Sequence, residues 1–287
     1  MAISEKIELL GKGLYKDIPD VLTLKSIPTA SELDYVGGED FQATMLDTIL
    51  PKAVEEEGIN FRDLLEIDFQ WVCRCLRILN YGPFYTTNAI YCTECGQISS
   101  GEYQVDLRTV EVKTLPQGFV NSLVVSKDEF IDFDGDIVLH LPTIQEMINA
   151  GKDPLFKDAN GDTNTALARM CYMITSISGN SKLTSVDVKF ILQNKLCDAD
   201  YKLLKAKVTE LTDYGLRAGG KTACPKCGGK EAAYVALVDD RFFRPTVGDL
   251  RAWKADRNAQ RAGGSANGNR EGGQRVENIP SNATAKV

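Results

Sequence analysis

Two pairs of cysteines constrain this chain more than any other feature of its sequence. Cys92 and Cys95 stand three positions apart, Cys224 and Cys227 repeat that spacing, and a glycine directly follows each pair. One tight turn with such a glycine can aim two thiolates at a metal ion about 2.3 Å away. Two such turns complete a tetrahedral ligand set. The sequence therefore predicts a structural zinc site formed by these four cysteines.

The separation of the two pairs indicates what such a site would do. Residues 96–223 lie between them. Closing a loop of roughly 130 residues costs about 4 kcal/mol plus a constant, whereas a structural zinc site returns about 10–16 kcal/mol. One zinc ion is therefore strong enough to fasten the chain segments on either side of a long insertion.

The same cysteines allow other interpretations. A CxxC pair can be a redox motif, but such pairs normally sit at a strand-to-helix junction, whereas strand-like sequence follows both pairs here. Incidental free thiols are a further alternative. A catalytic zinc site needs an open position for water, which four thiolates do not leave. The only histidine, His140, lies in the strand-like segment 137–141 and is expected to be structural.

Charge and composition limit the classes of function. The net charge of −7 argues against non-specific nucleic-acid binding as the main task, because such binding needs a basic surface. No apolar run approaches the roughly 18 residues that span a bilayer, so no membrane partner is expected. The N-terminus lacks a basic and then apolar signal pattern, which predicts a protein of the reducing cytoplasm. The remaining cysteines are then expected to be free and packed: Cys73, Cys75, Cys171 and Cys197.

The hydrophobic patterns predict an α+β fold. Its parts are a helical N-terminal region, a β-rich zinc-ribbon-like module closed by the two distant CxxC turns, and a helical insertion. The expected segments are an extended arm over 1–38, a helical region over 39–82, the β-rich module over 83–142 and 216–250, the insertion over 143–215, and a Gly/Asn/Arg-rich tail over 251–287. Alone in water the tail is expected to be disordered. The other interpretation is that it becomes ordered along an acidic partner surface.

The strongest helix is predicted over residues 61–80, with Asn60 as its N-cap and Gly82-Pro83 after it. Its polar stripe is expected to hold Asp63, Glu66, Gln70, Arg74 and Arg77. Asp68 breaks the pattern, because about 100° per residue places it on the apolar side. A buried carboxylate must be paired or hydrogen-bonded, so Asp68 is expected to have a structural partner rather than a catalytic role.

Shorter elements follow from local signals. Strands are predicted at 22–27, 84–90, 103–115, 122–126, 137–141 and 232–238, and helices at 163–177, 185–195 and 199–213. Thr143 begins a capping box for another short helix. The acidic run 132–136 is predicted to be a hairpin loop. A calcium loop is the alternative, but the run lacks the EF-hand spacing and its closing glutamate.

Taken in order, these features resemble the zinc-binding baseplate hub proteins of T-even-type phages with contractile tails. The resemblance covers about residues 25–245, and the order of the features is more specific than any one of them. They are the segment 28–37, the long helix with Asp68 that leads to 80–82, the first cysteine pair, 141–143, the helical part ending at 211–215, the second cysteine pair, and 242–245.

The resemblance implies a structural subunit of the tail baseplate, or an assembly factor of its hub, that binds other tail proteins in multiple copies. Its place would be the virion tail, assembled in the host cytoplasm, and it would not be an enzyme. The sequence agrees with the expectation that the chain is not an enzyme, because no nucleophile, paired carboxylate or phosphate loop has the neighbouring residues that its chemistry needs. The competing hypothesis is a zinc-ribbon nucleic-acid-binding or transcription-associated module, favoured by the cysteine turns and the arginines of the tail. The acidic balance, and the lack of aromatic residues among basic ones near the cysteines, argue against it.

Overall fold

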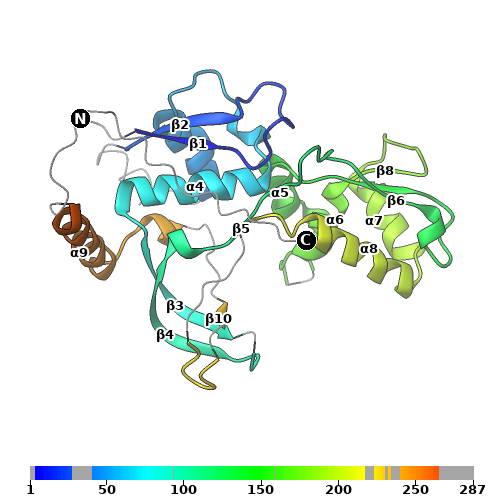
Figure 1. Ribbon diagram of the computed structural model, residues 1–287. Coiled ribbons are helices and arrows are strands. Elements are labelled where there is room, and N and C mark those ends of the chain that lie inside the picture. The colour runs from blue at the N-terminus through cyan, green and yellow to red at the C-terminus, as the bar shows by residue number, and fades with distance from the viewer. Residues whose placement is uncertain are drawn as a thin grey trace.

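The computed structural model describes residues 4–27, 41–92, 94–158, 160–216, 223–229, 232–233 and 240–264. Helices and small antiparallel sheets make up this part of the chain, in agreement with the predicted α+β class. Helix α4, Glu66–Tyr81, lies at the centre and contacts elements from both ends of the sequence (Figure 1). The extended arm predicted over residues 1–38 is described only from residue 4 to residue 27, and this part contains a two-stranded sheet. Residues 28–38 and the tail beyond residue 264 lie outside the described residues.

Helix α4 begins later than its periodicity predicts. Asn60 accepts a hydrogen bond from the Arg62 amide, but the turn that it caps is a separate 3-10 turn, Phe61–Asp63. The helix ends where predicted, at Gly82, whose φ of 79° suits glycine. The predicted polar stripe is wrong at its C-terminal half, because Arg74 and Arg77 are buried. Both guanidinium groups donate to backbone carbonyls that the rest of the fold brings to them.

The N-terminal strands pack on α4 as a two-stranded sheet. β1, Ser4–Glu8, pairs antiparallel with β2, Val21–Lys25. A short helical run follows, made of α2, Phe41–Thr44, a π-helical turn, Met45–Ile49, and α3, Leu50–Ala53. Apolar side chains from these elements, from α4 and from residues 85–107 form one hydrophobic cluster. The long helix is thereby covered on more than one side, as its mainly apolar sequence requires.

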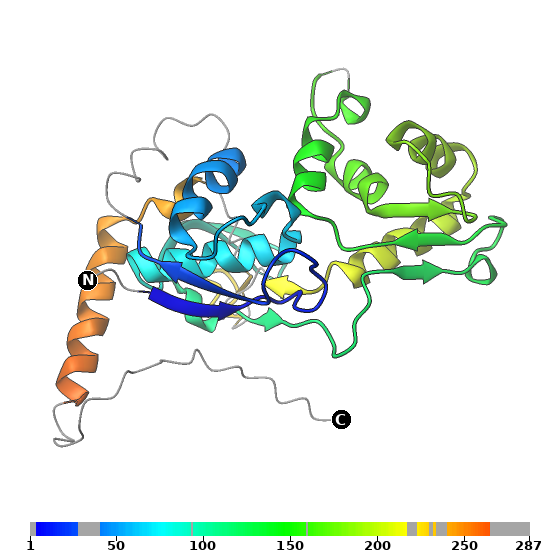
Figure 2. The same ribbon diagram turned by 90° about the horizontal axis from the view of Figure 1, so that it is seen from above.

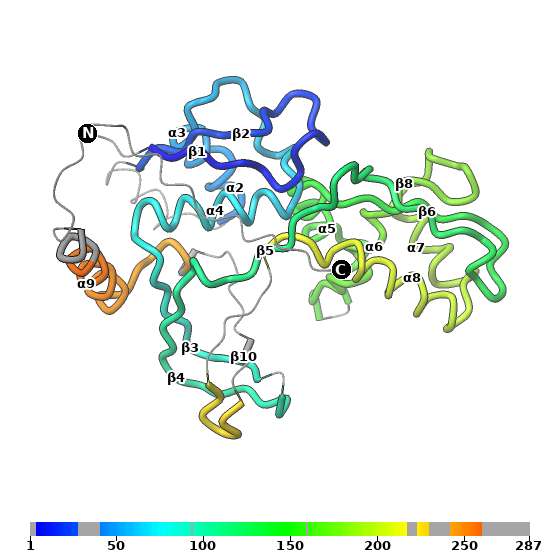
Figure 3. The backbone as a smooth tube through the Cα atoms, viewed as in Figure 1, coloured from blue at the N-terminus to red at the C-terminus, as the bar shows by residue number. Residues whose placement is uncertain are grey.

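A second sheet is built on a long hairpin that extends away from α4 (Figure 3), and the first cysteine turn joins the two strands of this hairpin. β3, Phe84–Cys92, pairs with β4, Ile98–Asp106, and its other edge pairs with the short strand β10, Ala232–Ala233. β4 thus starts earlier and ends earlier than the predicted strand 103–115, whose remainder forms a 3-10 turn and β5, Val112–Lys113. Of the predicted strand 232–238, only residues 232 and 233 are described.

Residues between the cysteine pairs supply most of a second hydrophobic cluster. The helices and strands that carry them lie beside α4 and the N-terminal sheet (Figure 2). This segment is bounded by β5 and β9, Gly215–Leu216, which pair antiparallel as the chain leaves and returns. Its sheet has the order β6, Leu123–Val125; β7, Ile137–Leu139; β8, Ile174–Ile177. Its helices are α5, Ile144–Lys152; α6, Thr165–Met173; α7, Ser185–Asn194; and α8, Asp198–Leu211.

Two expectations for this segment need correction. The predicted helix 163–177 ends at Met173, because Ile174–Ile177 pair with β7 instead of continuing the helix. The predicted boundary at residue 143 divides β6 and β7 from the β8 strand and the helices with which they pack. The capping box predicted at Thr143 is confirmed, since side-chain and backbone groups bond reciprocally there, and a second capping box forms at Thr184.

The C-terminal part of the described chain is also more regular than expected. Helix α9, Val247–Gly264, occupies the first residues of the segment that composition marked as disordered. The indole ring of Trp253, on this helix, lies close over Gly82. A Cβ atom at position 82 would lie 2.3 Å from that ring. Contacts of this kind supply order that the polar sequence alone does not.

Candidate metal centre

The first cysteine turn closes the end of β3. The Cys92 amide donates to the Gln97 carbonyl over 2.9 Å, and the Gly96 amide donates to the Cys92 carbonyl over 2.9 Å. Gly96 has a φ of 67°, in the left-handed region that favours glycine. These two hydrogen bonds fold the turn back on itself, so that Cys92 and Cys95 present their sulfurs on the same side.

The second turn repeats this geometry. The Cys224 amide donates to the Gly229 carbonyl over 2.7 Å, and the Gly228 amide donates to the Cys224 carbonyl over 2.8 Å. Gly228 has a φ of 75°. Backbone amides also point at the sulfurs, with Lys226 N 3.4 Å from Cys224 Sγ and Gly229 N 3.3 Å from Cys227 Sγ. Such N–H groups stabilise the negative charge of thiolates.

The fold brings the four predicted cysteines together. Cys92 Sγ lies 3.7 Å from Cys227 Sγ, Cys95 Sγ lies 3.9 Å from Cys224 Sγ, and all four sulfurs lie within 4.8 Å of one another. A tetrahedron with metal–sulfur bonds of about 2.3 Å has edges of about 3.8 Å. The sulfur set therefore has the dimensions of a tetrahedral four-thiolate metal site.

Contacts outside the sulfurs hold the two turns side by side. Ala232 and Ala233 pair with Cys92 and Tyr91, so the strand after the second turn lies along the strand before the first. Lys226 Nζ donates to the Ile98 carbonyl of β4 over 2.9 Å. Cys92 and Cys224 are buried and Cys227 is exposed, so the site lies at the surface with one side enclosed.

The protonation of the four thiols depends on their proximity. Amide groups of Cys227 and Lys226 lower the pKa of Cys224 to about 6. The Gly229 amide also favours the Cys227 thiolate, but desolvation and the sulfurs of Cys92, Cys95 and Cys224 outweigh it and raise that pKa to about 12. Four thiolates cannot share this volume without a compensating positive charge. A divalent metal ion would supply it.

The other candidate residues are not part of this site. Within the described ranges, these four cysteines are the one group of three or more potential metal-ligating side chains close enough to hold an ion. His140 Nε2 lies 3.1 Å from the Tyr172 carbonyl and 3.4 Å from Glu146 Oε1, which agrees with its expected structural role. Burial raises the pKa of Cys73, Cys75 and Cys171, so these three thiols remain protonated.

The acidic residues singled out in the sequence have structural partners. Asp68 is buried, accepts the amides of Leu10 over 2.6 Å and Gly11 over 3.0 Å, and accepts the Tyr15 hydroxyl. Desolvation raises its pKa in spite of these hydrogen bonds. The acidic run 132–136 does not gather into a cation site, because its backbone amides turn to the buried carboxylate of Asp200.

Sequence reasoning missed a buried polar network that anchors the chain after the second cysteine turn. Arg77 donates to the carbonyls of Phe242, Gly82 and Phe84, each over 2.8 Å, and lies 3.7 Å from Asp249 of α9. Asp249 is buried and accepts the Thr86 hydroxyl of β3 over 2.6 Å. The available signal was an arginine in the mainly apolar C-terminal half of α4.

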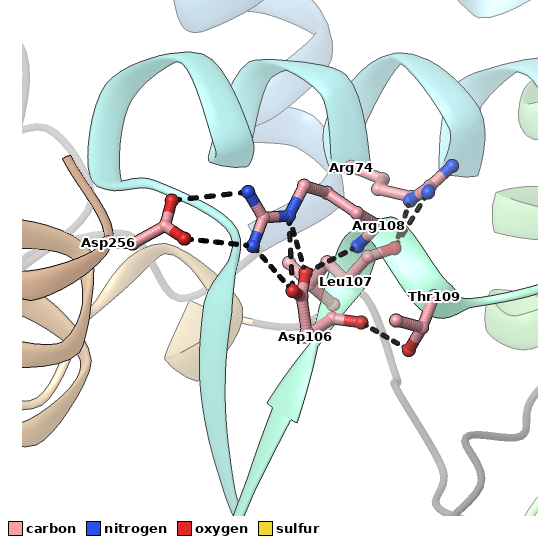
Figure 4. Close-up of polar contacts among 6 residues, drawn as sticks. All are labelled: Arg74, Asp106, Leu107, Arg108, Thr109 and Asp256. Atoms are coloured by element: carbon pink, nitrogen blue, oxygen red, sulfur yellow. Dashed lines mark hydrogen bonds and ion pairs between the residues drawn. The ribbon is translucent and has the colours of Figure 1, made fainter. Parts of the chain in front are cut away.

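A second set of polar contacts joins α9 to the β3–β4 hairpin (Figure 4). Arg108 donates to both carboxylate oxygens of Asp106 and reaches Asp256 of α9 over 3.2 Å. Nearby, the Arg74 guanidinium donates twice to the Leu107 carbonyl, over 2.7 and 3.0 Å. Together with Arg77, this pair of contacts fixes α9 and the hairpin that carries the first cysteine turn to the central helix.

No protein-family model, curated protein or solved structure matches this chain. No helix in the described part of the chain is long and apolar enough to cross a membrane.

Proposed function

We propose that the four cysteines hold a structural zinc ion that joins two distant parts of the chain. The observation that carries this proposal is the tetrahedral spacing of the sulfurs, with contacts of 3.7 and 3.9 Å between cysteines of different turns. Thiolates in this geometry suit zinc, and a closed four-sulfur set leaves no position for a reacting water. The ion would complete a zinc-ribbon-like module from β3, β4 and β10, and would stabilise it without taking part in chemistry.

Metal analysis tests this proposal directly. The purified full chain is expected to contain one zinc ion per molecule, and its zinc-edge absorption spectrum is expected to fit four sulfur neighbours. Replacement by cobalt should give the intense thiolate charge-transfer bands of a tetrahedral four-sulfur site. A chain that folds fully without metal, or a spectrum with oxygen or nitrogen neighbours, would reject the structural four-thiolate site.

We further propose that the chain is a structural subunit, or an assembly factor, of the baseplate hub of a contractile phage tail. Support comes from the order of sequence features shared with that family and from the closed thiolate set, which suits a scaffold better than an enzyme. Its partners would be other tail proteins, contacted in several copies, and it would catalyse no reaction.

Mass spectrometry of purified particles and of host fractions tests the role in the tail. A subunit is expected in purified virions at a fixed stoichiometry, whereas an assembly factor is expected in host fractions only. Absence from tail assemblies and their precursors would reject both versions.

Nucleic-acid binding is the outcome that would favour the competing zinc-ribbon hypothesis. A filter-binding titration of the full chain against salt separates the two, because phosphate contacts give affinity a steep salt dependence. We expect no appreciable affinity, given the net charge of −7. Tight binding with a steep salt slope would instead support a nucleic-acid module.

A further inference from the structure

One side of helix α9 contacts the rest of the protein. Asp249 is buried between Thr86 and Arg77, Trp253 covers Gly82, and Asp256 pairs with Arg108. At about 100° per residue, the three α9 positions fall within roughly one third of the helix circumference. Both carboxylates of the helix therefore point toward the body of the protein.

The outer face of α9 has a different character. Val247 and Leu250 are 65% and 43% exposed, and Arg251, Lys254 and Arg257 are exposed beside them. These five positions fall within roughly another third of the circumference. The face thus combines two apolar side chains with three positive charges and no negative one. Figure 2 shows α9 at the edge of the molecule.

The three bases of this face have no acidic partner among the residues that the structure describes. Arg257 lies over the ring of Trp253, 5.5 Å from its centroid, but that contact leaves its charge uncompensated. The chain as a whole carries a net charge of −7. A concentrated positive face on an acidic protein is a local feature, and a partner with complementary charge would recognise it.

The apolar pair decides between kinds of acidic partner. Val247 and Leu250 stand one helical turn apart among the bases, in the arrangement by which a helix face docks on a protein surface. A nucleic-acid backbone offers nothing for these side chains to bury against. The net negative charge also opposes polyanion binding at longer range. An acidic protein surface with an exposed apolar patch satisfies both features.

We propose that the outer face of α9 is a docking surface for an acidic, partly apolar surface of a neighbouring protein. The inference rests on the proposed function, in that a structural subunit must bind neighbours. It adds the place of contact and the chemistry of the partner.

A defined probe tests the docking surface. The probe is a fluorescent helical peptide with glutamate and leucine on one face, titrated with the full chain at low and physiological salt. Saturable, salt-sensitive binding is expected. The triple variant Arg251→Glu, Lys254→Glu, Arg257→Glu should weaken binding by about tenfold or more. The double variant Val247→Ser, Leu250→Ser should weaken binding severalfold at both salt concentrations.

A matched control separates the position of the charges from the net charge. The triple variant Lys195→Glu, Lys202→Glu, Lys205→Glu makes the same change on exposed lysines at the end of α7 and on α8. Its affinity for the peptide is expected to lie within about twofold of that of the unaltered chain, although its net charge changes as much as that of the α9 triple variant. Circular dichroism and zinc content verify that each variant is folded.

Three results would overturn the proposal. They are no peptide binding by the unaltered chain, equal loss in the α9 and control triple variants, and tighter binding of duplex DNA or of phosphatidylserine vesicles than of the peptide. These results leave the tail hypothesis untouched, because they do not involve virus particles. Conversely, absence from tail assemblies with intact peptide binding would reject the proposed role in the tail and keep the docking surface.

Discussion

Replacing Arg77 by methionine should destabilise the protein more than any other single change in helix α4. The arginine is fully buried and donates three hydrogen bonds of 2.8 Å to the carbonyls of Phe242, Gly82 and Phe84. Desolvation lowers its pKa to about 10, so it remains charged at neutral pH. Methionine keeps the packing of the aliphatic stem and removes the donors.

The size of the effect follows from the groups left behind. Each buried carbonyl that loses its donor costs about 1–3 kcal/mol. The carboxylate of Asp249 loses its cation at 3.7 Å but keeps the hydrogen bond from Thr86. Breaking a buried ion pair by removing one partner costs about 3–5 kcal/mol. The two estimates describe the loss of the same guanidinium group and are not additive. Three carbonyls at the low end of the first range cost about 3 kcal/mol, within the second range of about 3–5 kcal/mol, so we expect the free energy of unfolding to fall by about 4 kcal/mol.

The assay is urea denaturation followed by circular dichroism and by tryptophan fluorescence. Trp253 lies over Gly82, so its fluorescence reports detachment of α9. Arg74→Met is the matched control, because Arg74 is also buried and donates twice to one carbonyl, that of Leu107. Its cost should be about half, near 2 kcal/mol. Asp249→Asn added to Arg77→Met should recover about 1 kcal/mol by removing the unpaired charge.

Two results would contradict this account of the buried arginine. One is a loss below about 1 kcal/mol for Arg77→Met, which would mean that water replaces the lost donors. The other is a larger loss of unfolding free energy for Arg74→Met than for Arg77→Met. That result would mean that the hydrogen bonds to the Leu107 carbonyl stabilise the fold more than those of Arg77.

Three further predictions concern other parts of the molecule. Gly11→Ala should lower the free energy of unfolding by about 2 kcal/mol in urea denaturation, because the added Cβ would lie 2.7 Å from Asp68 Oδ2. Gly151→Ala is the control, because the space around Gly151 is open. Equal effects of the two substitutions would contradict the argument. Cys227→Ser should lower bound zinc well below one ion per chain and speed amide hydrogen exchange at Ala232–Ala233, whereas Cys197→Ser should change neither; full zinc binding by the former would reject the site. Desolvation raises the pKa of Asp200, but the amides of Ile131, Asp132 and Phe133 outweigh it and hold the pKa below 3.8. The stability that the ionised Asp200 contributes is thus present above that value and is lost as the pH falls below it. The Asp200→Asn variant should therefore lose less stability on acidification than the unaltered chain. An unchanged dependence of the urea midpoint on pH would refute this role.

Features that depend on near neighbours in the chain could be read from the sequence. The capping box at Thr143 forms as predicted, because both partners of each bond lie within three residues. The end of α4 at Gly82 and the cysteine turns are equally local. Asp68 was expected to be buried and bonded from helical periodicity alone, although its partners, Leu10, Gly11 and Tyr15, lie more than fifty residues away.

Errors arose where a distant segment supplied the deciding contact. Ile174–Ile177 leave the predicted helix because β7 offers backbone partners. Arg74 and Arg77 lie inside the protein because carbonyls from the β3–β4 hairpin and from Phe242 accept their hydrogen bonds. α9 is ordered because Trp253 and Asp249 meet Gly82 and Thr86. None of these partners is visible in a local pattern.

The sequence by itself determined two cysteine turns with the spacing and glycines of metal-binding turns, because a turn of six residues is governed by its own backbone. Only the tertiary structure decided that the two turns meet with sulfurs 3.7 and 3.9 Å apart. That meeting depends on the pairing of β10 with β3, on the return of the chain through β5 and β9, and on the buried arginine that holds α9. Each of these contacts joins residues more than one hundred positions apart, and their formation depends on the packing of the whole chain.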